Sequence, residues 1–76
     1  MVVTGAASGI GRAAALRFAT EGAAVMVADL DVDGGRATAE LIGDAGGEAR
    51  FRRTDVTAEA DVAAAVRATV DELGGL

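Results

Sequence analysis

The chain has 76 residues, of which 51% are hydrophobic and 25% are charged, and its formal net charge is −5. This acidic balance argues against a nucleic-acid partner, because nucleic-acid phosphates require a basic surface. The chain has no Cys, which excludes a disulfide framework and a thiolate metal site. No apolar run reaches the ~20 residues of a membrane span, and no signal peptide is visible. We therefore expect a cytoplasmic protein with no membrane partner and no metal.

The first two elements are a predicted strand at residues 2–4 and a predicted helix from 10 to about 21. Gly22 marks the end of this helix, since glycine readily takes a left-handed cap conformation. Helical spacing predicts one buried stripe on the helix, formed by Ile10, Ala14 and Phe18.

The second predicted strand, at 24–28, is nearly all apolar, as expected for a parallel strand covered on both faces. Asp31 and Asp33 mark the start of the second helix, because acidic groups complement the positive end of its dipole. This helix runs to about residue 45 and ends at Gly46-Gly47. Its predicted buried stripe is formed by Ala37, Leu41 and Ala45.

The third pair is a strand at 49–53 and a helix for which Thr57 is the predicted N-cap. Gly74-Gly75 are expected to end this helix. Its predicted apolar stripe is formed by Val62, Val66, Val70 and Leu73. Three basic residues in the strand are interpreted as protection of a sheet edge against pairing, namely Arg50, Arg52 and Arg53.

Alternating strands and helices with short connections predict an α/β protein with a parallel sheet. Right-handed crossovers place the strands in the order 3-2-1, with the first two helices on one face and the third on the other. This is the first β-α-β-α-β-α half of a Rossmann-like, three-layer, doubly wound fold. Residues 1–76 are thus expected to form a partial dinucleotide-binding domain, whose exposed sheet edge offers a surface for association.

The most informative motif is Thr4-Gly5-Ala6-Ala7-Ser8-Gly9-Ile10-Gly11, in which a strand runs through three glycines into a helix. Free N–H groups and the positive end of the dipole at such a helix start favour an anion. Gly5 is expected to take the tight turn, Gly9 to admit a phosphate, and Gly11 to allow close helix–strand packing. Ile10 is expected to turn its N–H to a pyrophosphate while its side chain packs in the core.

Two further residues of this segment carry polar side chains. Ser8 has two equally weighted interpretations, a contact to the adenosine phosphate or ribose and a solvated loop hydroxyl. Arg12 is interpreted as an exposed residue of the first helical turn rather than as a phosphate clamp.

Asp29 ends the second strand about 18 residues after Gly11, close to the ~20 residues at which an acid binds the ribose hydroxyls. This spacing favours the ribose role over a turn or cap role. A second phosphate on the ribose would meet a like charge at Asp29.

These features resemble the short-chain dehydrogenase/reductase family. The resemblance rests on Thr4-Gly5-x-x-x-Gly9-Ile10-Gly11, on Asp29, and on Asp55-Val56 after the third strand, and it covers essentially the whole chain. It implies hydride transfer between a nicotinamide dinucleotide and an alcohol or carbonyl. It also implies that Asp55 and Val56 bind adenine; the alternative for Asp55 is a loop residue ahead of a helix.

The resemblance implies NAD as the cofactor, with NADP less favoured. NADP users of the family often carry a basic residue before the second glycine or after the acid, and Ser8 and Leu30 stand at those places. The family's catalytic Ser, Tyr and Lys cannot be carried over, since the chain has no Tyr or Lys and stops short of the Asn-Asn-Ala-Gly segment. We therefore expect a cofactor-binding N-terminal portion that lacks the catalytic half and is inactive by itself.

Three alternatives remain at this point. The chain is a freestanding NAD-binding module without catalysis, a methyltransferase-like domain that holds S-adenosylmethionine, or a truncated product that does not fold alone. The glycine spacing disfavours the methyltransferase alternative. The substrate and the oligomeric state are not encoded in these residues.

Overall fold

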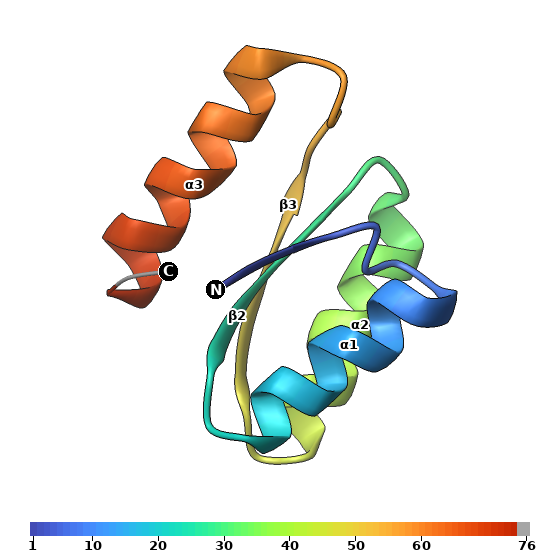
Figure 1. Cartoon of the computed structure of the whole chain (residues 1–76). Helices are drawn as coiled ribbons and strands as arrows, with labels where there is room; N and C mark the ends of the chain where they lie inside the picture. The colour runs from blue at the N-terminus through green and yellow to red at the C-terminus, as the bar shows by residue number, and fades with distance from the viewer. Residues whose placement is uncertain (75–76) are drawn as a thin grey trace.

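The computed structural model describes residues 1–74, in which three strands alternate with three helices (Figure 1). The strands are β1 (Val2–Thr4), β2 (Ala24–Asp29) and β3 (Glu48–Arg53). The helices are α1 (Gly9–Thr20), α2 (Val32–Asp44) and α3 (Glu59–Leu73). All six elements that the sequence predicts are confirmed, with bounds close to those expected.

The three strands form one parallel sheet in the order β1-β2-β3, with Val3 beside Val27 and Val27 beside Phe51. α1 and α2 cover one face of the sheet, and α3 lies on the other (Figure 1). The predicted strand order, parallel pairing and layers are therefore confirmed. None of the helices in the described range is long and apolar enough to cross a membrane.

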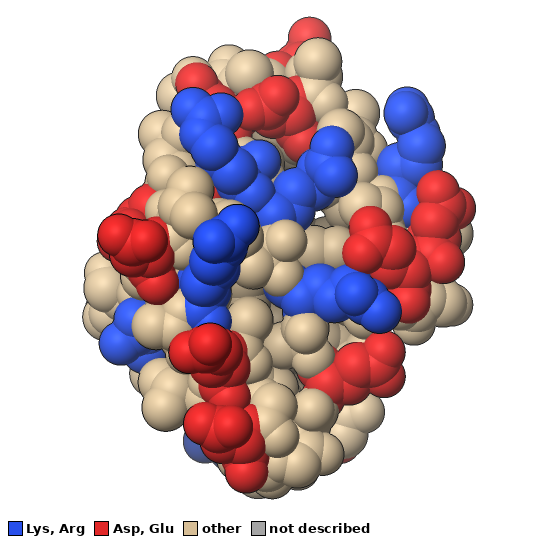
Figure 2. All heavy atoms as spheres, turned by 180° about the vertical axis from the view of Figure 1, so that it is seen from behind, with Lys and Arg blue, Asp and Glu red and all other residues tan. Residues whose placement is uncertain are grey.

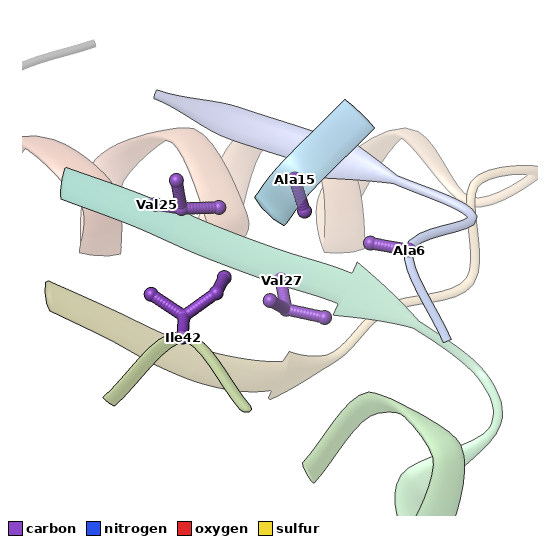
Figure 3. Packing of buried hydrophobic residues seen from close by; sticks show 5 residues of the cluster. All are labelled: Ala6, Ala15, Val25, Val27 and Ile42. Carbon is purple, nitrogen blue, oxygen red and sulfur yellow. The ribbon is translucent and has the colours of Figure 1, made fainter. Parts of the chain in front are cut away.

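β2 is the centre of the molecule because both of its faces are covered. Alternate residues of a strand point to opposite faces, so Val25 and Val27 face α1 and α2, where they pack with Ala6, Ala15 and Ile42 (Figure 3). Met26 and Ala28 are buried on the opposite face, which α3 covers. The apolar composition of this strand was therefore a sound guide to its position.

The predicted stripes of α1 and α2 are wrong in part. Ile10 is 90% exposed, and Ala15 is the buried residue of α1, while Phe18 is half-buried against the core. Leu41 is 44% exposed. The residues that α2 buries are Gly35, Thr38 and Ile42.

α3 also departs from its predicted apolar stripe. Val62 and Val70 are 37% and 48% exposed, and the helix buries Ala65, Ala68 and Thr69 instead. Small residues let a helix approach the sheet closely, so the larger aliphatic side chains lie to the sides of the contact face.

The helix ends follow the predictions at most positions. Asp31 is the N-cap of α2, and its carboxylate accepts a hydrogen bond from the Gly34 N–H at 3.0 Å, which satisfies a donor left free at the helix start. Thr57 is not the N-cap of α3, which is Ala58. Gly74 is a left-handed C-cap, and Gly75 lies outside the described residues.

β3 is an edge strand, as its arginines predict. Arg50 lies on the α3 side of this strand, and its Nε is 3.6 Å from Glu72 Oε1 in an exposed ion pair. Seen from behind, basic and acidic side chains lie interspersed on one surface of the molecule (Figure 2). Exposed pairs of this kind contribute little to stability. The role of these charges is to keep the edge of the sheet solvated and unpaired.

Candidate functional site

The loops that follow the three strands meet at one edge of the sheet, because the strands are parallel. A shallow hollow opens there, lined by Gly5, Asp29, Leu30, Thr54 and Val56. In an open parallel sheet this edge, at the carboxyl ends of the strands, is where ligands bind.

The three glycines where β1 leads into α1 have separate roles: Gly5 lies in the connecting loop, and Gly9 and Gly11 lie in the first turn of α1. Gly5 and Gly9 have φ of +65° and +59°, a left-handed conformation that favours glycine. A methyl group at either would meet nothing within 4 Å, so the backbone at both positions is open to a ligand. A methyl group at Gly11 would lie 1.9 Å from Gly5 O, which confirms that Gly11 permits close packing.

The start of α1 presents unpaired donors. The Arg12 N–H donates to Ser8 O at 3.3 Å, so the N–H groups of Gly9, Ile10 and Gly11 precede the first helical hydrogen bond. Within the described chain, Ser8 gives this helix no side-chain cap, and its first turn holds no acidic residue. The donors and the helix dipole therefore favour an anion at this point.

Ile10 lies in this turn but not in the core. Its side chain is 90% exposed beside the sheet edge, so the expectation that it packs inside is wrong. It forms instead an apolar surface next to the free N–H groups.

The Asp29 carboxylate lies between the glycine loop, residues 5–8 between β1 and α1, and the start of α2. Its Oδ2 accepts from the Ala7 N–H at 3.1 Å, and its Oδ1 accepts from the Asp31 N–H at 2.9 Å. Asp29 is half-buried, and each carboxylate oxygen has a further lone pair. The turn role of this residue is therefore present in the structure, and acceptor capacity remains for a ligand.

Asp55 is also held by backbone and hydroxyl groups. Its Oδ1 accepts from the Thr57 hydroxyl at 2.6 Å and from the Thr57 N–H at 2.9 Å. These hydrogen bonds, the hydroxyl first, hold the pKa of Asp55 below its ordinary value. The Asp55 N–H donates to Asp61 Oδ2 at 3.0 Å, so α3 fixes the loop, and Val56 lies beside the hollow.

Arg12 differs from its predicted role. It is half-buried rather than exposed, and its Nε donates to Thr38 Oγ1 at 2.8 Å. Its Nη2 donates to Ala7 O and, at 3.2 Å, to Gly34 O. The guanidinium thus joins α1, the glycine loop and α2. No periodicity or spacing in the sequence indicates this arrangement.

Thr54 is a further site residue that the sequence pattern does not indicate. It is buried, its N–H donates to Asp29 O at 3.0 Å, and its hydroxyl donates to Arg52 O at 3.0 Å. It therefore joins the ends of β2 and β3 under the hollow. A threonine at a strand end is too common to be recognised as a site residue.

A family model described as short chain dehydrogenase matches residues 1–76. The 2,5-dichloro-2,5-cyclohexadiene-1,4-diol dehydrogenase of Sphingobium indicum is 45% identical over 75 residues, which cover 99% of this chain and 30% of that protein. The 7alpha-hydroxysteroid dehydrogenase of Escherichia coli is 37% identical over 73 residues, which cover 96% of this chain and 29% of that protein.

Solved structures agree with these relatives. A hydroxysteroid dehydrogenase from Escherichia coli superposes with a TM-score of 0.92 at 37% identity, covering 96% of this chain and 31% of that one. A metagenomic short-chain oxidoreductase in complex with NADP superposes with a TM-score of 0.87 at 37% identity, covering 96% and 33%. The chain spans about 30% of the length of the two dehydrogenases from Sphingobium indicum and Escherichia coli.

Proposed function

Since the chain belongs to the short-chain dehydrogenase/reductase family and corresponds to the N-terminal part of such an oxidoreductase, we propose that it binds the adenosine diphosphate half of NAD. The observation that carries this proposal is the meeting of free α1 N–H groups and the Asp29 carboxylate at one sheet edge. The proposed binding residues are Gly5, Ser8, Gly9, Ile10, Gly11, Asp29, Leu30, Asp55 and Val56.

The diphosphate is proposed to lie against the start of α1. The N–H groups of Gly9, Ile10 and Gly11 donate to its oxygens, and the open space at Gly9 admits a phosphate. A local group of N–H donors can hold an anion without net positive charge, so the acidic character of the chain does not oppose this binding.

Adenosine is proposed to lie in the hollow between the β2 and β3 loops. Asp29 accepts hydrogen bonds from the ribose hydroxyls with the lone pairs that Ala7 and Asp31 leave free. Leu30 and Val56 are 51% and 55% exposed at the hollow, and they supply apolar contact to the base. Asp55 is assigned to the adenine amino group.

The preference for NAD over NADP is proposed to come from charge at Asp29. A 2′-phosphate ~4 Å from this carboxylate would meet a repulsion of about 4 kcal/mol at an effective dielectric constant of about 20. Solvent reduces this energy, but even about 1.4 kcal/mol changes affinity tenfold. A structural neighbour is in complex with NADP, so we assign the preference of this chain to the Asp29 side chain and not to the fold.

The cofactor supplies or accepts the hydride when it is bound, and this chain is proposed to contribute binding without the reaction. The chain contains no Tyr and no Lys, and the described hollow has Asp29 as its one ionisable lining residue. The substrate half of the site is therefore not assigned to any residue here.

Isothermal titration of the 76-residue chain with NAD, NADP and S-adenosylmethionine tests the proposal. We expect binding in the order NAD, then NADP, and none of S-adenosylmethionine. Asp29→Ala is expected to lower the affinity for NAD by about tenfold, which corresponds to the loss of a hydrogen bond to a charged group. It is also expected to reduce the ratio of the NAD affinity to the NADP affinity.

Asp33→Ala is the matched control, since it removes the same charge from an exposed position at the start of α2. It should leave both affinities near those of the unchanged chain, and circular dichroism should show that both variants keep their helices. If Asp29→Ala keeps the same ratio of NAD affinity to NADP affinity as the unchanged chain, the proposal that Asp29 binds the ribose is contradicted. Preferential binding of S-adenosylmethionine would refute the proposal as a whole.

A further inference from the structure

The side chains of Arg12 and Thr38 form a buried connection between α2 and the glycine loop. Thr38 is 0% exposed, and its hydroxyl donates to Ala6 O at 2.7 Å while it accepts from Arg12 Nε at 2.8 Å. Arg12 Nη2 donates to the next loop carbonyl, Ala7 O. Two consecutive carbonyls of the loop are therefore held from outside it.

Two N–H groups of the loop also have partners outside it. The Gly5 N–H donates to Ala28 O at 3.0 Å, and the Ala7 N–H donates to Asp29 Oδ2 at 3.1 Å. Each of these partners lies on β2, the central strand. The loop between β1 and α1 is thus held by β2 through its N–H groups and by the Arg12–Thr38 pair through its carbonyls.

The position of α2 makes this connection possible. Gly34 O lies 3.2 Å from Arg12 Nη2 and 3.1 Å from Thr38 Oγ1, and a methyl group at Gly34 would lie 3.0 Å from Ala7 O. The first turns of α2 therefore pack directly against the loop. The same methyl group would lie 2.5 Å from Asp31 Oδ2, so a side chain at this position would disturb the cap of α2 as well as crowd the loop.

We propose that Arg12 and Thr38 are positioning residues for the diphosphate: they turn the Ala6 and Ala7 carbonyls toward α2 and so keep the α1 N–H groups open to an anion. This inference rests on the proposed function. Binding sites gain affinity when their donors are fixed before the ligand arrives. Neither residue needs to touch the ligand, because both act through the loop.

The same hydrogen bonds define the role of the Arg12 guanidinium group. Its Nε donates to the Thr38 hydroxyl and its Nη2 donates to the Ala7 and Gly34 carbonyl oxygens, so these two nitrogens hold the loop and α2 rather than a phosphate. Removing the Thr38 hydroxyl would leave Arg12 Nε and Ala6 O without this partner in a buried place, which favours a rearranged loop.

The test compares ADP with adenosine as ligands of the 76-residue chain, with affinities measured by NMR titration. Thr38→Val keeps the shape of the side chain but removes the hydroxyl, and Thr38→Ser restores it. We expect Thr38→Val to lower the affinity for ADP by about tenfold or more and the affinity for adenosine by less than about twofold. Thr38→Ser should return ADP to near its original affinity, which a general loss of packing would not do.

Arg12→Met provides a second variant that leaves the Thr38 hydroxyl bonded to Ala6 O, and the same ADP-specific loss is expected of it. The inference is overturned if both variants bind ADP as the unchanged chain does, or if ADP and adenosine weaken equally. If Thr38→Val does not fold, the Arg12→Met result decides in the same way. Failure of the unchanged chain to bind ADP would refute the proposed function itself, which separates the two outcomes.

Discussion

Replacing Gly11 with Ala gives the most direct view of the packing between α1 and the glycine loop. The added methyl group would lie 1.9 Å from Gly5 O and 2.6 Å from Gly5 C. Ordinary contacts begin near 3.4 Å, so the loop or the helix must move by about 1.5 Å. Both neighbours are backbone atoms of a loop that is hydrogen-bonded to β2 and α2, so neither can turn aside as a flexible side chain would.

The expected cost follows from two opposing effects. Overpacking a tight contact lowers the free energy of unfolding by about 1–3 kcal/mol or more. The higher helix propensity of Ala offsets at most about 1 kcal/mol of this loss. We therefore expect Gly11→Ala to lower the free energy of unfolding by about 1–2 kcal/mol. In a domain of this size that corresponds to a fall in Tm of roughly 5–15 °C.

Gly43→Ala is the matched control, because Gly43 lies in α2 and a methyl group there would meet nothing within 4 Å. It should raise the free energy of unfolding by up to about 1 kcal/mol. Thermal and urea unfolding followed by circular dichroism measure both variants, and NAD titration should show a loss only for Gly11→Ala. The reasoning is refuted if Gly11→Ala is as stable as Gly43→Ala and binds NAD unchanged.

Other predictions concern α2, the β3 loop and activity. Gly35→Ala would place a methyl group 2.1 Å from the Phe51 ring, so unfolding should become easier by about 1–3 kcal/mol, and Gly35→Ala combined with Phe51→Leu should recover part of that loss in urea unfolding. Thr57→Val should raise the pKa of Asp55 toward its ordinary value, because the hydroxyl is the largest cause of the lowering; carbon-detected NMR titration measures it, and an unmoved pKa would contradict the assignment. Because the pKa of Asp55 is lowered on folding, its contribution to stability is present above about pH 4 and is lost as the pH falls through the lowered value. The 76-residue chain should oxidise no alcohol with NAD, and reproducible turnover by the pure chain, followed by NADH absorbance, would refute this.

The sequence was sufficient for the elements and their order. Hydrophobic runs, glycine caps and acidic helix starts agree with one another, and short β-α connections allow only one handedness. The glycine spacing also located the loop whose φ values at Gly5 and Gly9 are positive. These features are local, so they can be recognised without knowledge of the packing.

The contact faces of the helices could not be predicted in the same way. Helical spacing placed Leu41 and Val70 on the buried stripes, whereas both are exposed and the structure buries Gly35, Thr38 and Ala68. Close approach to a sheet favours small residues, and that distance is set by the whole domain. Hydrophobic periodicity alone is therefore a weak guide where Ala and Gly are frequent.

The network around Arg12 was missed for a related reason. Its partners are backbone carbonyls and the Thr38 hydroxyl, 26 residues away in the chain. A lone arginine after a glycine motif gives no sign of which acceptors it will meet. Only the approach of α2 to the loop, through Gly34, brings these groups together.

The central claim is that the N–H groups at the start of α1 hold the diphosphate of NAD. The most direct measurement is the two-dimensional ¹H–¹⁵N NMR spectrum of the chain as NAD is added. We expect saturable shifts at the N–H groups of Gly9, Ile10 and Gly11, with weaker ones at Leu30 and Val56. Saturable binding that leaves those three signals in place, and instead shifts residues at the opposite end of the sheet, such as Gly47, would contradict the account.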